Sequence, residues 1–211
     1  MRKMIILFSC VALSAAIVGC QTAYRMQGLQ KVKAKFKPEK RKMLIVPFKD
    51  PAYTYFESVE GTELARDLGD YMQRWKVTEV MYDSFFPRGM DALAKTKLAE
   101  GDEVEAWKAL AKEMNCELVV IGQIEDFQAG GERSVNVVKG FAMVQVQVLD
   151  MKKDAVTVWR LPSTPVNYPD GWEYADLPTG DIPPKMLKTR LLNKAAEAIG
   201  QCFHDHFEPI S

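Results

Sequence analysis

The residue types most able to carry out chemistry are scarce in this chain of 211 residues. Its two histidines, His204 and His206, stand near the C-terminus, and Cys202 precedes them at the same spacing of two. Cysteine and histidine are common zinc ligands, so a metal site is one interpretation of the cluster. On a helix, however, residues two apart point to different faces, and no CxxC pair completes a ligand set. We therefore expect a frayed helix end here and no metal.

Other catalytic patterns are missing from the sequence. It contains no G-x-S-x-G, no P-loop and no G-x-G-x-x-G, and Gly130-Gly131 indicates a turn between strands. Glu125 and Asp126 are adjacent carboxylates, but nothing in the sequence pairs them as general acid and base. We expect no enzyme activity and no cofactor. A hydrolase or ligand-binding enzyme with carboxylates in a cleft remains the alternative.

The segment Arg160–Pro184 holds six of the eleven prolines, interleaved with Tyr168, Trp172 and Tyr174. Proline lowers the entropy lost on ordering, and aromatic side chains supply much of the binding energy of interfaces. We predict a long loop whose three aromatic residues bind a protein partner. The alternative is that they only fasten the loop to the domain.

The N-terminus has the three parts of an export signal. Basic Arg2 and Lys3 precede an apolar run from Met4 to Val18, which is shorter than a transmembrane helix needs. Ile17-Val18-Gly19-Cys20 resembles the bacterial lipobox, which implies cleavage after residue 19 and a lipid on Cys20. The resemblance also implies, because Gln21 follows the cysteine, that the protein faces the periplasm from the outer membrane. A free or disulfide-bonded Cys20 after an ordinary signal is the alternative.

The charges are unevenly distributed along the chain. Between residues 21 and 42 there are eight basic residues and one acidic residue, a net charge of +7, whereas residues 43–211 have 18 basic and 27 acidic residues, a net charge of −9. We interpret residues 20–42 as a tether whose lysines contact anionic head groups; a solvated linker is an equal alternative. The acidic domain argues against nucleic acid as a partner. The candidate head-group contacts are Lys31, Lys33, Lys35 and Lys37.

Residues 43–211 are long enough for one α/β domain with one core. Apolar periodicity predicts eight elements, which should form a mixed sheet of about five strands with helices packed on it. Cys116 and Cys202 could form a disulfide or be two small buried side chains, and we favour the second. The elements are a strand at Met43–Val46, a helix at Thr62–Trp75, a strand at Val77–Tyr82, a helix at Glu103–Met114, strands at Glu117–Phe127, Phe141–Asp150 and Ala155–Trp159, and a helix at Lys185–Phe207.

This order of elements, with Met43–Phe48, Val119–Ile124 and the Val148-Leu149-Asp150 turn toward Trp159, resembles the superfamily of the curli-secretion lipoprotein CsgG. The TolB amino-terminal domain and LpoB are related members. The resemblance implies the α/β fold and a place in the cell envelope. A CsgG-like secretion subunit is a third alternative. Residues 84–102 and 128–139, however, are too short and polar to form its membrane-crossing hairpins, which argues against this role.

A short tether also limits which partners the domain reaches. Twenty-two residues span about 26 Å as a flexible coil and at most about 75 Å when extended, which argues against a partner across the periplasm. We therefore expect a non-enzymatic envelope lipoprotein that binds or helps to assemble a protein near its own membrane. Self-assembly into a homo-oligomer is consistent with the same sequence.

Overall fold

The computed structural model describes residues 29–50, 58–81, 103–129, 140–169 and 184–209. The chain forms two compact units, which are described separately. The larger unit is Lys35–His204, and the smaller unit combines Met1–Ala34 with Asp205–Ser211. The predicted lipidation residue Cys20, and Trp172 and Tyr174 of the Pro/aromatic segment, lie outside the described residues.

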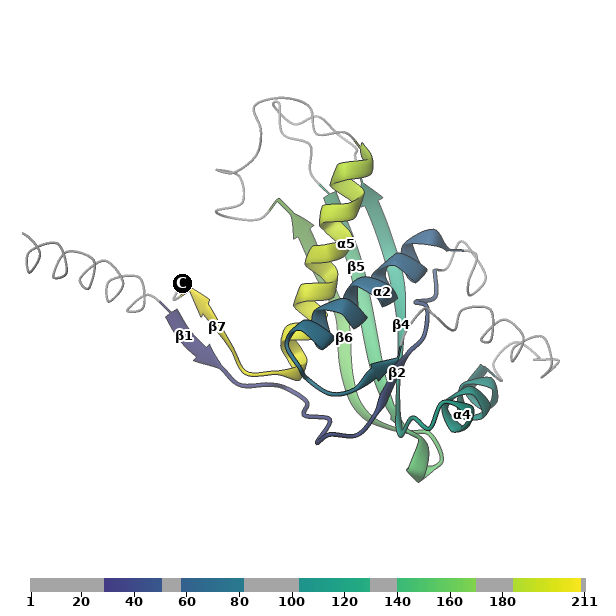
Figure 1. The fold of residues 1–211 in the computed structure, drawn as a ribbon. Helices are drawn as coiled ribbons and strands as arrows, with labels where there is room; N and C mark the ends of the chain where they lie inside the picture. Colours follow the sequence, from purple (N-terminus) through teal and green to yellow (C-terminus); the bar gives the residue numbers. More distant parts are fainter. Residues whose placement is uncertain (1–28, 51–57, 82–102, 130–139, 170–183, 210–211) are drawn as a thin grey trace, which may run out of the picture. The chain divides into compact units, whose positions relative to one another are not determined.

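The larger unit contains a mixed five-stranded sheet (Figure 1), which confirms the predicted fold class. Its strand order is β3-β2-β4-β5-β6; β2 runs parallel to β3 and β4, and β4, β5 and β6 are antiparallel neighbours. The predicted sequence of strands and helices is confirmed. The elements are β2 (Met43–Ile45), α2 (Val59–Arg74), β3 (Val80–Met81), α4 (Glu103–Glu113), β4 (Leu118–Ala129), β5 (Gly140–Asp150), β6 (Val156–Tyr168) and α5 (Pro184–Gly200).

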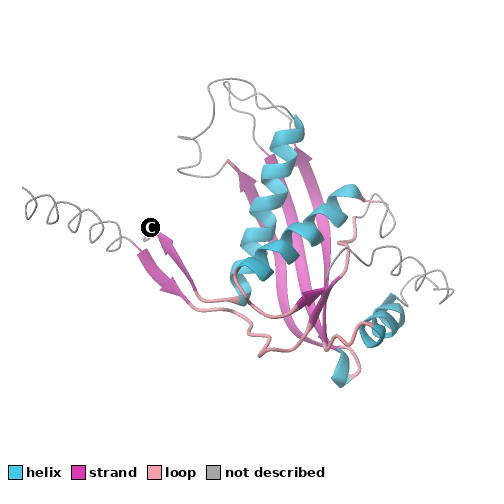
Figure 2. Ribbon diagram, in the orientation of Figure 1, coloured by secondary structure: helices cyan, strands magenta, loops and turns pink. Residues whose placement is uncertain are grey.

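The helices cover the two faces of the sheet unequally (Figure 2). Each face also has its own core of buried side chains. Helices α2 and α5 lie on one face, where Leu64, Leu68 and Leu191 are buried with the inward side chains of β4, β5 and β6. Helix α4 packs Trp107 against Leu44 and Val119 on the other face. Strand β4 is thus covered on both sides, which explains why its first residues are uniformly apolar.

Helix α2 approaches the end of β2 very closely. Its N-cap is Ser58, whose hydroxyl accepts a hydrogen bond from Gly61 N at 3.0 Å. Gly61 O in turn accepts from Phe48 N at 3.1 Å, and a Cβ on Gly61 would lie 2.0 Å from the carbonyl oxygen of Phe48. Only a residue without a side chain fits this contact between helix and strand.

A buried carboxylate stabilises the end of the sheet at which β5 turns into β6. Asp150 ends β5 and is 2% exposed. Its Oδ2 accepts a hydrogen bond from Arg41 Nη1 at 2.8 Å, and its Oδ1 accepts one from Lys152 N at 3.0 Å in the 3-10 turn Met151–Lys153. Asp150 therefore joins the chain entering β2 to the β5–β6 hairpin.

Strand β6 corrects the loop prediction for the Pro/aromatic segment. Residues 160–168 continue the strand instead of leaving it, and Tyr168 pairs with Gly140. Strand β6 tolerates Pro162 and Pro165 because it is at the edge of the sheet. Pro162 also lies at a register shift, where no backbone N–H is needed to pair with β5. Residues 170–183 lie outside the described part of the chain.

The smaller unit contains a two-stranded antiparallel sheet that the sequence analysis missed. Strand β1 (Leu29–Val32), in the middle of the predicted basic tether of residues 20–42, pairs with β7 (His206–Pro209). The predicted last helix is correspondingly shorter, because α5 ends at Gly200 and a 3-10 turn, Gln201–Phe203, follows it. The predicted second strand is also short, since β3 has two residues.

Among the helices that the structure describes, none combines the length and apolar character required to cross a bilayer.

A cleft between helices α2 and α5 as candidate functional site

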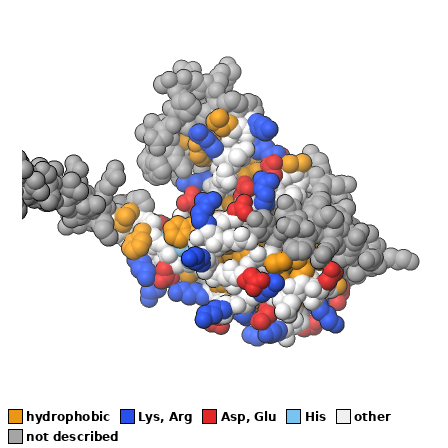
Figure 3. Space-filling model, in the orientation of Figure 1, with side chains coloured by type: hydrophobic (Ala, Val, Ile, Leu, Met, Phe, Trp, Pro, Cys, Tyr) orange, Lys and Arg blue, Asp and Glu red, His pale blue; other side chains and the backbone are white. Residues whose placement is uncertain are grey.

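A cleft of about 570 Å³ opens between α2 and α5 at the end of β6. Both helices are long and amphipathic, and each contributes polar residues from the side that faces away from the sheet. Figure 3 shows cationic and anionic side chains interspersed on the face of the molecule that carries these helices. The lining residues are Asp67, Tyr71, Arg74, Trp75, Tyr168, Arg190, Asn193, Lys194, Ala196 and Glu197.

Three rings stack at one end of the cleft. The Trp75 ring lies on the His204 ring with centroids 4.8 Å apart and an interplanar angle of 15°, and Tyr71 lies 5.7 Å from His204. A hydrogen bond of 3.1 Å joins the Tyr71 hydroxyl to His204 Nε2. Trp75 is nevertheless 54% exposed, so a rigidly held indole faces solvent. Such a side chain offers contact area at a low entropic cost.

Tyr71 keeps its proton at neutral pH. Burial of the phenol, together with the charge of Glu197, raises the pKa of Tyr71 to about 12, although Arg74 acts in the opposite direction. The hydroxyl is therefore a neutral hydrogen-bonding group. It holds His204 against Trp75 and is unsuited to act as a phenolate nucleophile.

Cations also line the cleft. Arg190 Nη1 donates to the Tyr168 hydroxyl at 2.8 Å, and the guanidinium carbon lies 5.8 Å from the centre of the Tyr168 ring. Arg74 is exposed and Lys194 is half-buried at the same cleft. Tyr168, predicted to bind a partner, is buried, lines the cleft and accepts the hydrogen bond from Arg190.

Asp67 is the lining carboxyl group with a raised pKa. Burial raises the pKa of Asp67 above its ordinary value of 3.8, against the lowering effect of the neighbouring Arg66, whose Nη2 lies 3.3 Å from Asp67 Oδ1. Aspartate in this position is a poorly hydrated acid held by one arginine.

We predict that Asp67→Asn raises stability near pH 7. Because the folded pKa lies above the unfolded value, the ionised form is disfavoured in the fold above that pKa, and this penalty disappears below the unfolded value. The melting temperature should increase at neutral pH, and the gain should vanish at about pH 3. Asp126→Asn, at an exposed position of β4, is the control, because Asp126 is not among the charges that act on Asp67. An equal gain at both pH values would contradict the assignment.

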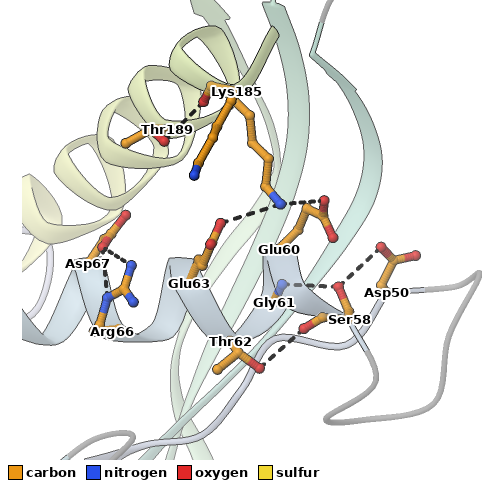
Figure 4. A network of polar contacts seen from close by, with 11 residues as sticks. Asp50, Ser58, Glu60, Gly61, Thr62, Glu63, Arg66, Asp67, Lys185 and Thr189 are labelled. Carbon is orange, nitrogen blue, oxygen red and sulfur yellow. Dashed lines mark hydrogen bonds and ion pairs between the residues drawn. The ribbon is translucent and has the colours of Figure 1, made fainter.

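An ion-pair network braces the two helices next to the cleft (Figure 4). Lys188 Nζ of α5 lies 2.8 Å from Glu60 and 3.4 Å from Glu63 of α2. Burial alone would raise the pKa of Glu60, but the hydrogen bond and charge of Lys188 hold it below its ordinary value. The carboxylate of Glu60 therefore stays ionised and stabilises the contact between α2 and α5.

The opposite face of the sheet has a smaller hollow of about 100 Å³. Glutamines from neighbouring strands line it, and Gln145 Nε2 donates to Gln123 Oε1 at 3.3 Å. Lys49 also lines the hollow, and its Nζ lies 3.5 Å from Glu103 Oε1, so its charge is paired with a carboxylate beside the neutral amides.

The predicted C-terminal cluster does not assemble. Cys202 is buried in the 3-10 turn, with its Sγ 3.6 Å from Ala198 O, and His204 stacks with Trp75. His206 belongs to β7, where its Nε2 lies 2.9 Å from Glu208. Among the described residues, no group of three potential ligands is positioned to bind a metal ion. The cluster ends in a turn and a strand, so the prediction of a frayed helix end was wrong.

Cys116 and Cys202 are both buried and are not joined by a disulfide, which confirms the interpretation that we favoured. Cys116 lies in the core under α4, whereas Cys202 lies in the core under α2 and α5, so the sheet separates them. Burial raises the pKa of the Cys116 thiol to about 11, which keeps it protonated and unreactive.

Sequence reasoning missed the aromatic end of the cleft. Tyr71 and Trp75 continue the apolar stripe of Leu64, Leu68 and Met72, and this helical periodicity alone predicts that all five pack on the sheet. The structure buries the three aliphatic residues and leaves the two aromatic ones at the cleft. Their position in the last turn of the helix and just beyond it was the available signal, because a helix end often extends past the sheet that it covers.

Among the predicted lysines, all four are exposed. Lys31 and Lys33 belong to the smaller unit, where Lys31 Nζ lies 3.1 Å from Asp205, and Lys35 and Lys37 begin the larger unit. The backbone at Lys35 is tied to Cys202 O by a 2.8 Å hydrogen bond. The basic segment is therefore structured from Leu29 onward instead of being a plain coil.

No family model and no curated protein matches the sequence. Three similar solved structures are the PelC dodecamer from Paraburkholderia phytofirmans (11% identity, 84% of this chain and 98% of that chain, TM-score 0.45), lipoprotein GNA1162 from Neisseria meningitidis (11% identity, 74% and 99%, TM-score 0.43) and the LpoB C-terminal domain from Salmonella enterica (14% identity, 64% and 84%, TM-score 0.37). At such low identity the likeness carries no function over to this chain.

Proposed function

We propose that the protein is a non-enzymatic envelope lipoprotein, anchored through Cys20 in the outer membrane, whose larger unit binds a segment of an envelope protein in the cleft between α2 and α5. The observation that carries the proposal is the half-exposed Trp75, held rigidly on His204 beside the cleft. Tryptophan, tyrosine and arginine are enriched among the hot spots of protein interfaces, and all three line this cleft.

The chemistry of the cleft defines the segment that would fit. Arg74, Arg190 and Lys194 outnumber Asp67 and Glu197 among the lining residues. A bound segment should therefore carry acidic residues near the cations and an apolar or aromatic residue against Trp75. The alternative of a hydrolase rests on the partly buried Asp67 of the cleft, and Arg66 already engages this carboxyl group. A protein-binding role uses more of the residues that line the cleft.

We predict that Lys194→Glu and Trp75→Ala each reduce capture of the partner at least about tenfold, because each removes a central contact of the cleft. The full-length lipoprotein would be crosslinked in cells, extracted in detergent and analysed by mass spectrometry. Point substitutions are preferred to deletion of the Pro/aromatic segment, since residues 160–168 belong to the sheet.

Lys112→Glu is the matched control, because it makes the same charge change on the exposed side of α4. The proposal stands if one envelope protein is captured through an acidic peptide and Lys112→Glu leaves its yield unchanged. Capture of a second copy through the same cleft would identify the alternative, a homo-oligomer. Equal yields from wild type and Lys194→Glu would exclude the cleft as the binding site.

A further inference from the structure

The two faces of the β1–β7 ribbon differ in character. In its antiparallel register Leu29 is opposite Pro209 and Lys31 is opposite Phe207, so these four residues share one face. His206 belongs to the other face, where its side chain is 10% exposed and contacts Glu208. The imidazole of His206 is therefore largely buried on one face of the ribbon, and the other face carries Leu29, Lys31 and Phe207.

The face that carries Phe207 leaves large apolar side chains in contact with solvent. Phe207 is 63% exposed and Leu29 is 41% exposed. The two are diagonal neighbours across the strand pair, at a spacing of about 7–8 Å, so they form a single patch. An apolar patch on so small a sheet gains little from the fold and indicates a contact outside it.

The place of this ribbon along the chain favours one occupant for the patch. Leu29 follows Cys20 by nine residues, which reach at most about 32 Å when fully extended. A lipid on Cys20 would thus hold the ribbon close to the bilayer surface. Exposed Lys31 and Lys33 stand beside the patch, and ammonium groups flanking apolar side chains suit the boundary between head groups and acyl chains.

We infer that the Leu29–Phe207 face of the β1–β7 ribbon lies on the membrane surface, with both side chains among the lipid head groups. The inference rests on the proposed lipid anchor at Cys20. The ribbon is then a second, non-covalent contact with the bilayer. It involves Phe207 near the C-terminus as well as Leu29 near the anchor, and it fixes which face of the smaller unit meets the lipid.

Photo-crosslinking of the full-length lipoprotein tests this contact. The protein would carry p-benzoylphenylalanine in place of Phe207 or Leu29, and it would be reconstituted in vesicles of phosphatidylethanolamine and phosphatidylglycerol. Gln30, on the other face of β1, and Val156, exposed on β6 of the larger unit, are the control positions. After illumination, mass spectrometry would identify the crosslinked species and the state of Cys20.

Phospholipid adducts should be at least about fivefold more abundant at positions 207 and 29 than at 30 and 156. Equal yields at all four positions, or adducts to a second copy or to the protein's own chain, would overturn the membrane contact and leave the anchor standing. An unmodified Cys20 would overturn the proposed anchor and the inference that depends on it. The two failures are thus distinguished in one sample.

Discussion

Gly61→Ala should destabilise the protein by about 3 kcal/mol, although alanine is ordinarily the better helix former by about 1 kcal/mol. The new Cβ would lie 2.0 Å from the Phe48 carbonyl oxygen. That oxygen belongs to the backbone and cannot rotate away, so α2 must move from the sheet. Phe48 is fully buried and Phe48 N donates to Gly61 O, so a shift would disturb the core and a hydrogen bond together.

Gly140→Ala provides the control for this substitution. A Cβ there would lie 3.1 Å from Leu191 Cδ2, which is the end of a flexible side chain. Urea unfolding of both variants should show a large decrease of the midpoint for Gly61→Ala and a small change for Gly140→Ala. A stabilised Gly61→Ala variant would mean that α2 does not approach Phe48 as closely as described.

Asp150→Ala should cost about 3 kcal/mol, because it removes one partner of a buried ion pair. Arg41 would lose the carboxylate that lies 2.8 Å from its guanidinium, and Lys152 N would lose its acceptor. These contacts join the entrance of β2 to the β5–β6 hairpin. The free energy of unfolding, measured in urea at neutral pH, checks the prediction.

Asp154→Asn is a suitable comparison, since Asp154 is four residues away and also pairs with a cation. Asparagine removes the charge and still tolerates the left-handed backbone at this position, where φ is 57°. Its side chain is 91% exposed beside Lys108, where water screens the interaction. Its loss should change stability little. If the two variants unfolded at the same urea concentration, the contacts of Asp150 would not stabilise the β5–β6 hairpin as proposed.

The sequence was sufficient to predict the order of the eight elements of the larger unit. Helix periodicity and strand alternation are local patterns, and the sheet followed from them. Strands β1 and β7 were missed because they pair over more than 170 residues, and nothing local in Lys31 or His206 indicates a partner so distant. The continuation of β6 was missed because Pro162 and Pro165 were interpreted as loop residues, an interpretation that ignores how an edge strand tolerates them.

The candidate site was less predictable than the fold. The periodicity of α2 assigns Tyr71 and Trp75 to the same stripe as Leu68, and period alone cannot distinguish a core position from the rim of a cleft. Arg190 and Lys194 lie on a helix that has other lysines, so their charge alone does not identify them as residues of a site. Their meeting with Trp75 depends on the packing of α5 on α2, which is a tertiary property.

Strand β6 has thirteen residues on the open side of the sheet, a length that in many proteins would invite pairing with another chain. Pro162 and Pro165 cannot donate a hydrogen bond, and the register shifts along the β5–β6 pair bend the strand. A foreign strand would therefore meet an interrupted row of donors on a bent edge. The prolines that led to the loop prediction for this part of β6 therefore also protect the folded protein against edge-to-edge aggregation.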